Sequence, residues 1–321
     1  MRSIWKDTLT AAFLGLILPG VLLNGAALYL DTMPIDPVQE ETKPQQETLK
    51  LYLRNSDGGV QMQDMDSYLT GVVMAEMPAS FEPEALKAQS VAARTYTCKA
   101  YTTGGKHGDG SVCMDSGCCQ AYLTEEAYLA KGGSPDGIEK IRSAVLATSG
   151  EVLTYDGILI EATYFSCSGG STEDAAAVWG TEYPYLQAVP SPGEEAAAYH
   201  TDSVSVTPQQ FQRSLERELP GPPQTWFGAV SYTEGGGVDT IVIGGEIYTG
   251  TQLRSLLNLR STAFSVSVQA DAITITTRGY GHRVGMSQYG ADAMAVAGST
   301  YEQILAYYYQ GTRIDKMPVL G

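Results

Sequence analysis

The sequence has little positive charge. Its 321 residues include 20 Lys and Arg against 36 Asp and Glu, which gives a formal net charge of −16. The basic residues are scattered along the chain, whereas a protein that follows a phosphate backbone needs them clustered. Nucleic acid is therefore excluded as a partner, and a polymer bound by this chain is expected not to be strongly anionic.

No charged residue interrupts the mainly apolar run from Leu9 to Leu30, and Arg2 and Lys6 precede it. Such a run is long enough to cross a bilayer as a helix, and the positive residues favour a cytosolic N-terminus. The sequence predicts a single-pass cell-membrane anchor at residues 1–30, with the remaining chain outside the cytosol. A cleaved signal peptide is the alternative, since small residues lie near the end of the run.

Apolar side chains are almost absent from residues 31–48, which are rich in Pro, Gln, Glu and Thr and are typical of a flexible stalk. Residues 49–321 carry both helical and strand patterns and no internal repeat, which predicts an α+β body. Within it, residues 195–275 are expected to form a smaller second lobe. Tyrosine is abundant, with 20 residues against 6 Phe and 3 Trp, and an exposed Tyr ring can stack on a sugar.

One carboxylate, Glu76, is expected in the last turn of a helix. That helix can begin with Asp66 as its N-cap and must end before Pro78. The unpaired carbonyls and the negative end of the helix dipole would raise the pKa of Glu76, as a general acid near neutral pH requires. A second helix, with Ser80 near its N-cap and Pro83 in its first turn, would form a floor behind it. On geometry alone, however, a lone Glu at a helix end is usually a solvated surface group.

Four blocks of sequence carry a family resemblance, and they are Tyr68–Tyr96, Thr163–Gly170, Gly279–Ala291 and Tyr301–Gly311. In this order they cover most of the chain from about Leu49, and they resemble the stage II sporulation protein D family of peptidoglycan lytic transglycosylases, in its clostridial type. Ser90 and Arg283 depart from the family pattern, which usually has Ala and Gly there. The bulk and charge of Arg283 are expected to alter the fine shape of a sugar groove.

The resemblance implies cleavage of the bond between N-acetylmuramic acid and N-acetylglucosamine in glycan strands stripped of stem peptides, during engulfment in sporulation. The product would be a 1,6-anhydro end. Glycoside hydrolases usually need two carboxylates, but here the C6 hydroxyl of the muramic residue attacks its own ring, so one acid can suffice. Glu76 is assigned both proton transfers. The resemblance also implies a membrane-anchored amidase and a membrane organiser as partners, at the mother-cell membrane facing the forespore.

The family blocks supply further candidates for substrate contact, each of which is individually more often structural: Arg94, Tyr164, Ser168, Gly169, Gly170, His282, Gln288 and Tyr289. The ring of Tyr164 could stack on a sugar, and glycines let the backbone come close to one. Arg94 is a candidate either to orient Glu76 or to bind the lactyl carboxylate of the muramic residue.

Five cysteines are present, an odd number. Cys113 and Cys119 lie six residues apart and His107 lies six before Cys113, in a Gly-rich segment. Two thiolates and an imidazole are normal zinc ligands, and clostridial-type homologues resemble this chain in having a His and two Cys there. A structural zinc is therefore predicted, with a fourth ligand to be chosen from Cys118, Cys98, Asp109 or water. A disulfide such as Cys113 with Cys118 is the alternative.

Two other functions stay open. A cell-wall cysteine peptidase would use Cys167 as its nucleophile and His282 as its base, although no third, orienting residue can be identified. A non-catalytic glycan-binding module that stimulates a partner amidase is the second, a role that the wider family is known to include.

Overall fold

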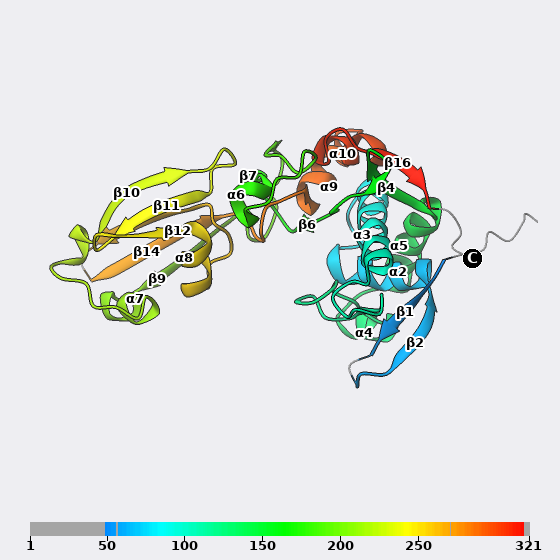
Figure 1. Cartoon of the computed structure of the whole chain (residues 1–321), viewed down its shortest axis with the longest axis horizontal. Coiled ribbons are helices and arrows are strands. Elements are labelled where there is room, and N and C mark those ends of the chain that lie inside the picture. The colour runs from blue at the N-terminus through cyan, green and yellow to red at the C-terminus, as the bar shows by residue number, and fades with distance from the viewer. Residues whose placement is uncertain (1–48, 56, 270, 318–321) are drawn as a thin grey trace, which may run out of the picture. The chain divides into compact units, whose positions relative to one another are not determined.

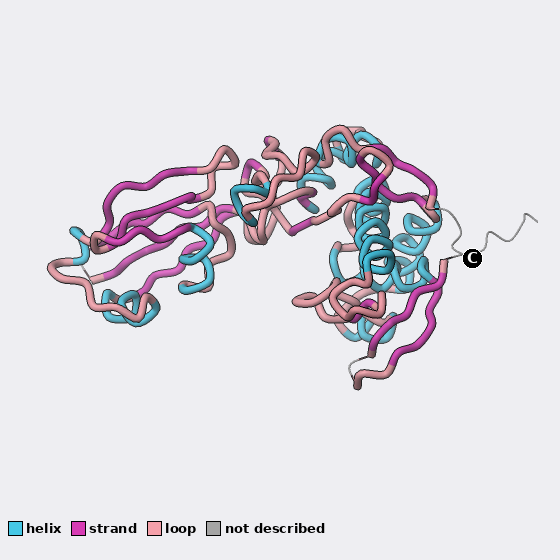
Figure 2. Tube along the Cα trace, in the orientation of Figure 1, coloured by secondary structure: helices cyan, strands magenta, loops and turns pink. Residues whose placement is uncertain are grey.

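The computed structural model describes residues 49–55, 57–269 and 271–317. The anchor and the stalk predicted for residues 1–30 and 31–48 lie outside the described residues. Of the helices in the described part of the chain, none combines the length and the apolar character needed to cross a membrane. The described chain contains helices and several small, mainly antiparallel sheets, which confirms the predicted α+β fold class (Figures 1 and 2).

The helices follow one another as α2 (Met65–Glu76), α3 (Pro83–Thr103), α4 (Glu125–Ala130), α5 (Pro135–Ala147), α6 (Ala175–Trp179), α7 (Pro208–Ser214), α8 (Gly250–Leu256), α9 (Gln288–Val296) and α10 (Tyr301–Tyr308), with a 3₁₀ turn η1 (Pro223–Thr225). The strands are β1 (Lys50–Arg54), β2 (Val60–Asp64), β3 (Val112–Cys113), β4 (Glu151–Tyr155), β5 (Ile158–Leu159), β6 (Tyr164–Phe165), β7 (Gly170–Ser171), β8 (Pro190–Ser191), β9 (Thr201–Val206), β10 (Phe227–Tyr232), β11 (Val238–Ile243), β12 (Glu246–Thr249), β13 (Phe264–Gln269), β14 (Ala272–Arg278), β15 (Met286–Ser287) and β16 (Arg313–Lys316).

Helix α2 begins earlier than the sequence suggested. The N-cap is Asp64, whose Oδ1 accepts a hydrogen bond from Ser67 N–H at 2.9 Å, because the β1–β2 hairpin leads directly into the helix. Asp66 is instead buried inside the first turn. The helix ends at Glu76, as predicted, since Met77 before the proline is extended at φ −126° and ψ 141°.

Helix α3 packs against α2 and α5, and the three helices lie together in Figure 1. Its N-cap is Glu82 rather than Ser80, and Pro83 occupies the first turn as expected. Ala85, Ala88 and Ala92 are fully buried in a core that also holds residues of β4, β15, α9 and α10. Small side chains on α3 let these elements come close to its backbone.

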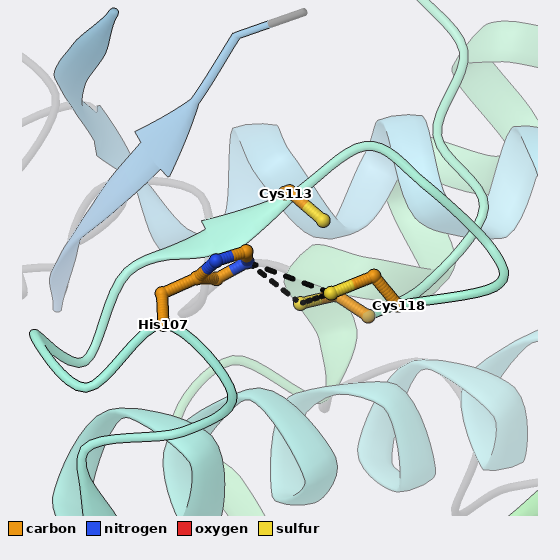
Figure 3. A group of neighbouring side chains, drawn as sticks. His107, Cys113 and Cys118 are labelled. Carbon is orange, nitrogen blue, oxygen red and sulfur yellow. Dashed lines mark hydrogen bonds between the residues drawn. The ribbon is translucent and has the colours of Figure 1, made fainter. Parts of the chain in front are cut away.

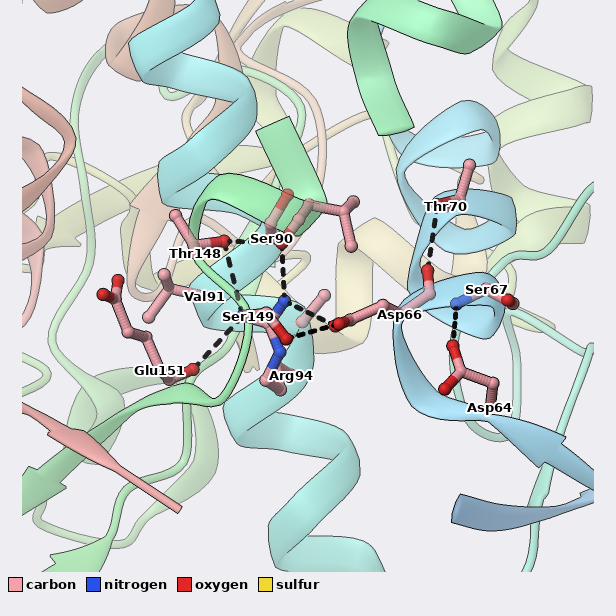
Figure 4. A network of polar contacts seen from close by, with 12 residues as sticks. Asp64, Asp66, Ser67, Thr70, Ser90, Val91, Arg94, Thr148, Ser149 and Glu151 are labelled. Carbon is pink, nitrogen blue, oxygen red and sulfur yellow. Dashed lines mark hydrogen bonds and ion pairs between the residues drawn. The ribbon is translucent and has the colours of Figure 1, made fainter. Parts of the chain in front are cut away.

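The side chain of Arg94, on α3, is enclosed in the body (Figure 4). Its guanidinium pairs with Asp66 at 3.1 Å, with 2% and 6% of the two side chains exposed. It also donates to the carbonyl of Val145 at 3.1 Å and to that of Glu151 at 3.3 Å. The ion pair joins α3 to α2, and the two carbonyl bonds join α3 to α5 and to the first residue of β4.

A separate hydrophobic core lies between residues 206 and 275, and it includes Phe211, Ile241 and Ile275. Two three-stranded antiparallel sheets, ordered β10-β11-β12 and β13-β14-β9, surround it together with α7 and α8. Strand β14 pairs with both β13 and β9, so Ile275 lies opposite Val266 and Val204.

A short parallel pairing brings two distant family blocks together. Strands β6 and β15 lie side by side, with Tyr164 opposite Met286 and Phe165 opposite Ser287. Helix α9 starts directly after β15, so its first residue, Gln288, emerges beside the β6 block. This pairing positions the site described next.

Candidate active site

Glu76 lies between two pockets. The first, of about 350 Å³, and the second, of about 330 Å³, both include Glu76 and Ser166 in their linings. Among the described residues that line the two pockets, Glu76 is the only carboxylate. A polymer that occupied both pockets would pass this one acid.

Two hydrogen bonds fix the carboxyl group of Glu76. Gln288 Nε2 donates to Oε2 at 3.2 Å, and Ala121 N–H donates to Oε1 at 3.3 Å. Burial raises the pKa of Glu76, while these two donors act in the opposite direction by stabilising the charged form. The sequence predicted a raised pKa from the helix dipole, and the structure gives a raised pKa whose largest cause is desolvation by burial.

The first pocket has an aromatic wall. Tyr96, Tyr164, Phe165, Tyr280 and His282 all line it. The hydroxyl of Tyr164 donates to Gln120 Oε1 at 2.7 Å, and burial holds the pKa of this phenol well above its ordinary value. Its ring is therefore fixed at the pocket wall as a neutral surface.

His282 is neutral at this wall. Its Nδ1 accepts the backbone N–H of Val284 at 3.1 Å, so the ring proton of the neutral form is on Nε2. Burial lowers the pKa of His282 to about 4, with a further contribution from the positive charge of Arg254. Phe165 and Trp179 pack against the ring at centroid distances of 5.6 and 5.3 Å. His282 can donate a hydrogen bond, but it is not a cation at neutral pH.

The second pocket contains the other residues of the α9 block that the sequence singled out. Gln288 and Tyr289 line it, together with Phe81 and Tyr128. The ring of Tyr289 meets that of Phe81 edge-on at 4.9 Å. Gln288 thus contacts the carboxyl group of Glu76. Tyr289, the next residue of α9, lines the same pocket.

Ser168, Gly169 and Gly170 lie away from both pocket linings. Glu194 Oε2 accepts from Ser168 N–H at 2.6 Å, from the Ser168 hydroxyl at 2.9 Å and from Gly169 N–H at 3.0 Å. Gly170 N–H donates to the Ser168 hydroxyl oxygen. The turn binds a carboxylate of its own chain, an interaction that the sequence did not predict. Arg94 also lines neither pocket, because its guanidinium is used by Asp66 and by backbone carbonyls.

A cluster of four ligand atoms lies next to the first pocket. His107, Cys113, Cys118 and Cys119 place their ligand atoms within 4.8 Å of one another (Figure 3). His107 Nε2 lies 3.7 Å from the sulfur of Cys118 and 3.6 Å from that of Cys119, and these two sulfurs are 4.0 Å apart. A tetrahedral zinc site with normal bond lengths has ligand separations of roughly 3.6–3.8 Å. The cluster could therefore hold a metal ion in a four-ligand site.

The predicted ligand set of His107, Cys113 and Cys119 is thus brought together, with Cys118 as the fourth member. All five cysteines are free, so the structure contains no disulfide between Cys113 and Cys118. Of the other candidates for the fourth position, Cys98 is buried in the core and Asp109 pairs with Arg54 at 2.8 Å. Cys119 also lines the first pocket. An ion bound by the cluster would therefore fix the position of this part of the pocket wall.

Cys167 is poorly suited to act as a nucleophile. The residue is fully buried and lines neither pocket. Burial raises the pKa of its thiol to about 11, so the reactive thiolate is disfavoured near neutral pH. Its backbone bonds to Tyr280, and His282 uses Nδ1 to accept from Val284. This geometry disfavours the cysteine-peptidase alternative.

Comparison with known proteins shows which family the sequence resembles over most of its length. A family model described as stage II sporulation protein matches residues 55–155, which include α2, α3 and the His/Cys cluster. Stage II sporulation protein D of Bacillus subtilis (strain 168) is 37% identical over 302 residues, covering 92% of this chain and 87% of that protein. The protein of the same name from Bacillus amyloliquefaciens is 38% identical over 288 residues, covering 86% of this chain and 83% of that protein. The chain belongs to the stage II sporulation protein D family.

A second kind of relative is also similar to this family member. The amidase enhancer of Bacillus subtilis (strain 168) is 29% identical over 305 residues, covering 77% of this chain but only 40% of that protein. The similarity therefore extends across most of the present chain, whereas the enhancer has a large additional part.

Some residues of the site in this stage II sporulation protein D family member were not singled out from the sequence. Gln120 and Ala121 bond to Tyr164 and Glu76, and their one signal was their place directly after Cys119. Tyr96 and Tyr280 lie inside family blocks and line the first pocket. Sequence pattern gives no direction to a side chain, so Arg94 and Ser168 were indistinguishable from these pocket residues before the fold was known.

Proposed function

We propose that this protein is a peptidoglycan lytic transglycosylase that cleaves the bond between N-acetylmuramic acid and N-acetylglucosamine in peptide-free glycan strands. One observation carries the proposal: Glu76, held by Gln288 and Ala121 at the junction of two pockets, is the only carboxylate among the described lining residues. A hydrolase of the usual kind needs a second carboxylate in the same site, whereas an intramolecular attack does not.

The proposed reaction uses Glu76 twice. Its carboxyl group first gives a proton to the oxygen that joins the two sugars, and the bond between that oxygen and C1 of the muramic residue breaks. The C6 hydroxyl oxygen of the same residue then bonds to C1, and its proton returns to the Glu76 carboxylate. No water is consumed, and the new end is a 1,6-anhydro sugar. Tethering of the nucleophile supplies much of the rate gain, so the protein mainly has to position the strand.

The groups around Glu76 would support the two proton transfers without gaining or losing a proton themselves. Gln288 and Ala121 orient the carboxyl group and moderate its pKa. The ring of Tyr164 offers a wall for a sugar, and the neutral His282, which is hydrogen-bonded to the backbones of Val284 and Tyr164, supports that wall. A zinc ion bound by His107, Cys113, Cys118 and Cys119 would supply a structural crosslink for the segment that carries Gln120 and Ala121.

The names of the relatives support a wider setting for this activity. We place the protein in cell-wall remodelling during engulfment in sporulation, on the similarity to two proteins named stage II sporulation protein D. Its location would be the mother-cell membrane, facing the forespore, with residues 1–30 as anchor and residues 31–48 as stalk. A membrane-anchored amidase, which removes stem peptides, and a membrane organiser are the proposed partners.

A second candidate function rests on the similarity to the amidase enhancer. In this case the pockets would bind glycan without cleaving it, and the protein would stimulate a separate amidase. Glu76 would then act as a hydrogen-bonding group and not as an acid.

Product analysis distinguishes these functions. Purified protein is incubated with peptide-free glycan strands, with intact peptidoglycan, and with intact peptidoglycan plus an amidase, and the products are identified by mass spectrometry. The transglycosylase predicts anhydro ends from the peptide-free strands, lost in Glu76→Gln and retained in Glu125→Gln, which changes an exposed carboxylate on α4. If the protein alone yields no product from any substrate and accelerates only the amidase, the second candidate is correct.

A further inference from the structure

Two arginines lie beside the first pocket of a protein whose net charge is −16. The guanidinium carbon of Arg260 lies 4.4 Å from the ring centre of Tyr199 and 5.1 Å from that of Tyr280. The two rings meet edge-on at 5.1 Å. Tyr280 also lines the first pocket, so these three side chains, here called the Arg260 cluster, continue the pocket wall.

The Arg260 cluster is accessible. Tyr199 is 40% and Tyr280 is 36% exposed, and 39% of the Arg260 side chain is exposed. Arg260 pairs with Asp202 through Nε at 3.2 Å, and its backbone carbonyl accepts from Gly281 N–H at 3.1 Å. The carbonyl bond fixes Arg260 next to the pocket segment, while the ion pair uses one nitrogen and leaves the terminal nitrogens for a ligand.

Arg254, on α8, is the second arginine. Its side chain is half-buried, and none of the described residues forms a hydrogen bond or an ion pair with its guanidinium. Burial lowers the pKa of Arg254, while the Tyr280 phenol acts in the opposite direction, and the positive charge of Arg254 lowers the pKa of His282. Arg254 is therefore close enough to two residues of the first pocket to act on them electrostatically. A partly desolvated cation without a counterion is costly in an isolated protein, and an anionic ligand would compensate it.

A peptide-free glycan strand offers one kind of anion. Each muramic residue carries a lactyl group whose carboxylate is free once the stem peptide has been removed. When the peptide is present, the same carbon is part of a neutral amide. A guanidinium binds a carboxylate through two parallel charge-assisted hydrogen bonds, which an amide cannot reproduce.

We infer that Arg254 and the Arg260 cluster form a subsite for an N-acetylmuramic acid residue, in which the arginines bind the free lactyl carboxylate and the Tyr280 ring contacts the sugar. The subsite would select strands from which the stem peptide has been removed. The sequence suggested Arg94 for binding the lactyl carboxylate, but its guanidinium is buried in an ion pair with Asp66. Arg254 and Arg260 would bind that carboxylate instead. The inference rests on the proposed function, because it names what distinguishes the preferred substrate.

Binding measurements test the subsite without turnover. The full chain carrying Glu76→Gln is titrated with three ligands of equal length: a peptide-free strand, a strand that keeps its stem peptides, and a chitooligosaccharide, which lacks lactyl groups. The double change Arg254→Gln and Arg260→Gln should weaken binding of the peptide-free strand about tenfold or more. Binding of the chitooligosaccharide should change little, because it has no carboxylate.

The double change Arg213→Gln and Arg313→Gln is the matched control, since it removes two positive charges from exposed positions on α7 and β16. It should leave all three affinities near those of the parent. Equal losses for the peptide-free strand and the chitooligosaccharide, or no loss for either, would overturn the inference. If the double variant does not fold, Arg254→Gln alone decides, because that side chain forms no described bond that folding would lose.

The outcome is independent of cleavage. An arginine-dependent preference for the peptide-free strand, together with a parent protein that releases no anhydro ends, would support the subsite and refute the transglycosylase. Release of anhydro ends with no such preference would refute the subsite alone.

Discussion

At Glu76, the pKa of the carboxyl group reflects a balance between burial, which raises it, and two hydrogen-bond donors, which lower it. The proposed first step needs the protonated form, so the cleavage rate should fall as the pH rises through this raised pKa. Gln288 Nε2 stabilises the charged form. Replacing it in Gln288→Met removes that donor, raises the pKa further and should move the falling limb of the pH–rate profile to higher pH.

The profile is measured with peptide-free strands at saturating concentration. Gln209→Met, at an exposed position on α7, is the control and should keep the profile of the parent. A limb that stays in place or moves to lower pH in Gln288→Met would show that Gln288 does not act on the acid.

Helix α2 and the segment that follows the His/Cys cluster are packed together at Gly71. A Cβ atom there would lie 2.2 Å from the ring of Tyr122, which stacks on Tyr68 at 5.6 Å. The carbonyl of Gly71 also accepts from Leu123 N–H at 3.0 Å. Gly71→Ala should therefore displace this segment, which carries Ala121.

Alanine improves helix propensity by about 1 kcal/mol relative to glycine, whereas overpacking costs about 1–3 kcal/mol. We expect Gly71→Ala to lower the free energy of unfolding by roughly 1 kcal/mol, as measured by urea denaturation. In a Tyr122→Ala background the same change should become neutral or stabilising, because the clash is gone. An equal loss in both backgrounds would refute this packing account.

The His/Cys cluster should stabilise the element that follows it. A metal present at a hundred times its Kd adds about 2.7 kcal/mol to the folded state. Treatment with a strong chelator should lower the Tm of the parent and reduce cleavage, since Cys119 and Gln120 line the first pocket. Metal content per chain is measured in parallel.

Cys118→Ser should reduce metal content and the chelator effect, whereas Cys98→Ala should leave both near the parental values, because Cys98 is outside the cluster. Retention of full metal content by Cys118→Ser would remove it from the ligand set. A parent that holds no metal after purification with zinc would refute the site.

Local sequence signals predicted the boundary between α2 and α3 better than they predicted the directions of the side chains on these helices. The end of α2 before Pro78 and the start of α3 at Pro83 follow from proline chemistry over a few residues. Glu76 and Gln288 lie 212 positions apart, and long-range packing brings them together, because α9 follows β15, which pairs with β6, and also packs against α3. Arg94 points inward because Asp66, a residue predicted as a cap, is buried and needs a counterion.

Across the whole molecule, a buried ion pair connects residues 206–275 to the rest of the described chain. Arg283 and Glu173 pair at 3.0 Å, with 2% and 1% of their side chains exposed. Arg283 also donates to the carbonyl of Gly235 at 2.8 Å, and Glu173 accepts from Gly237 N–H at 2.8 Å. Arg283 has a φ of 65°, which favours the glycine usual in the family.

Arg283→Gly should relieve backbone strain of about 1–2 kcal/mol, but it leaves Glu173 buried without a counterion, at a cost of about 3–5 kcal/mol. A net loss of roughly 2 kcal/mol in unfolding free energy is expected from urea denaturation. Adding Glu173→Gln should recover part of it, since the unpaired charge is gone. If Arg283→Gly has the same free energy of unfolding as the parent, the ion pair between Arg283 and Glu173 does not stabilise the fold.

In the proposed reaction one carboxyl group, Glu76, gives a proton to the leaving oxygen and takes one from the C6 hydroxyl as the anhydro ring closes. The most direct measurement is digestion of peptide-free strands in water labelled with heavy oxygen, followed by mass spectrometry of the new ends. We expect anhydro ends without label from the parent, and none from Glu76→Gln. Labelled reducing ends from the parent, or unlabelled anhydro ends at the parental rate from Glu76→Gln, would contradict this reaction.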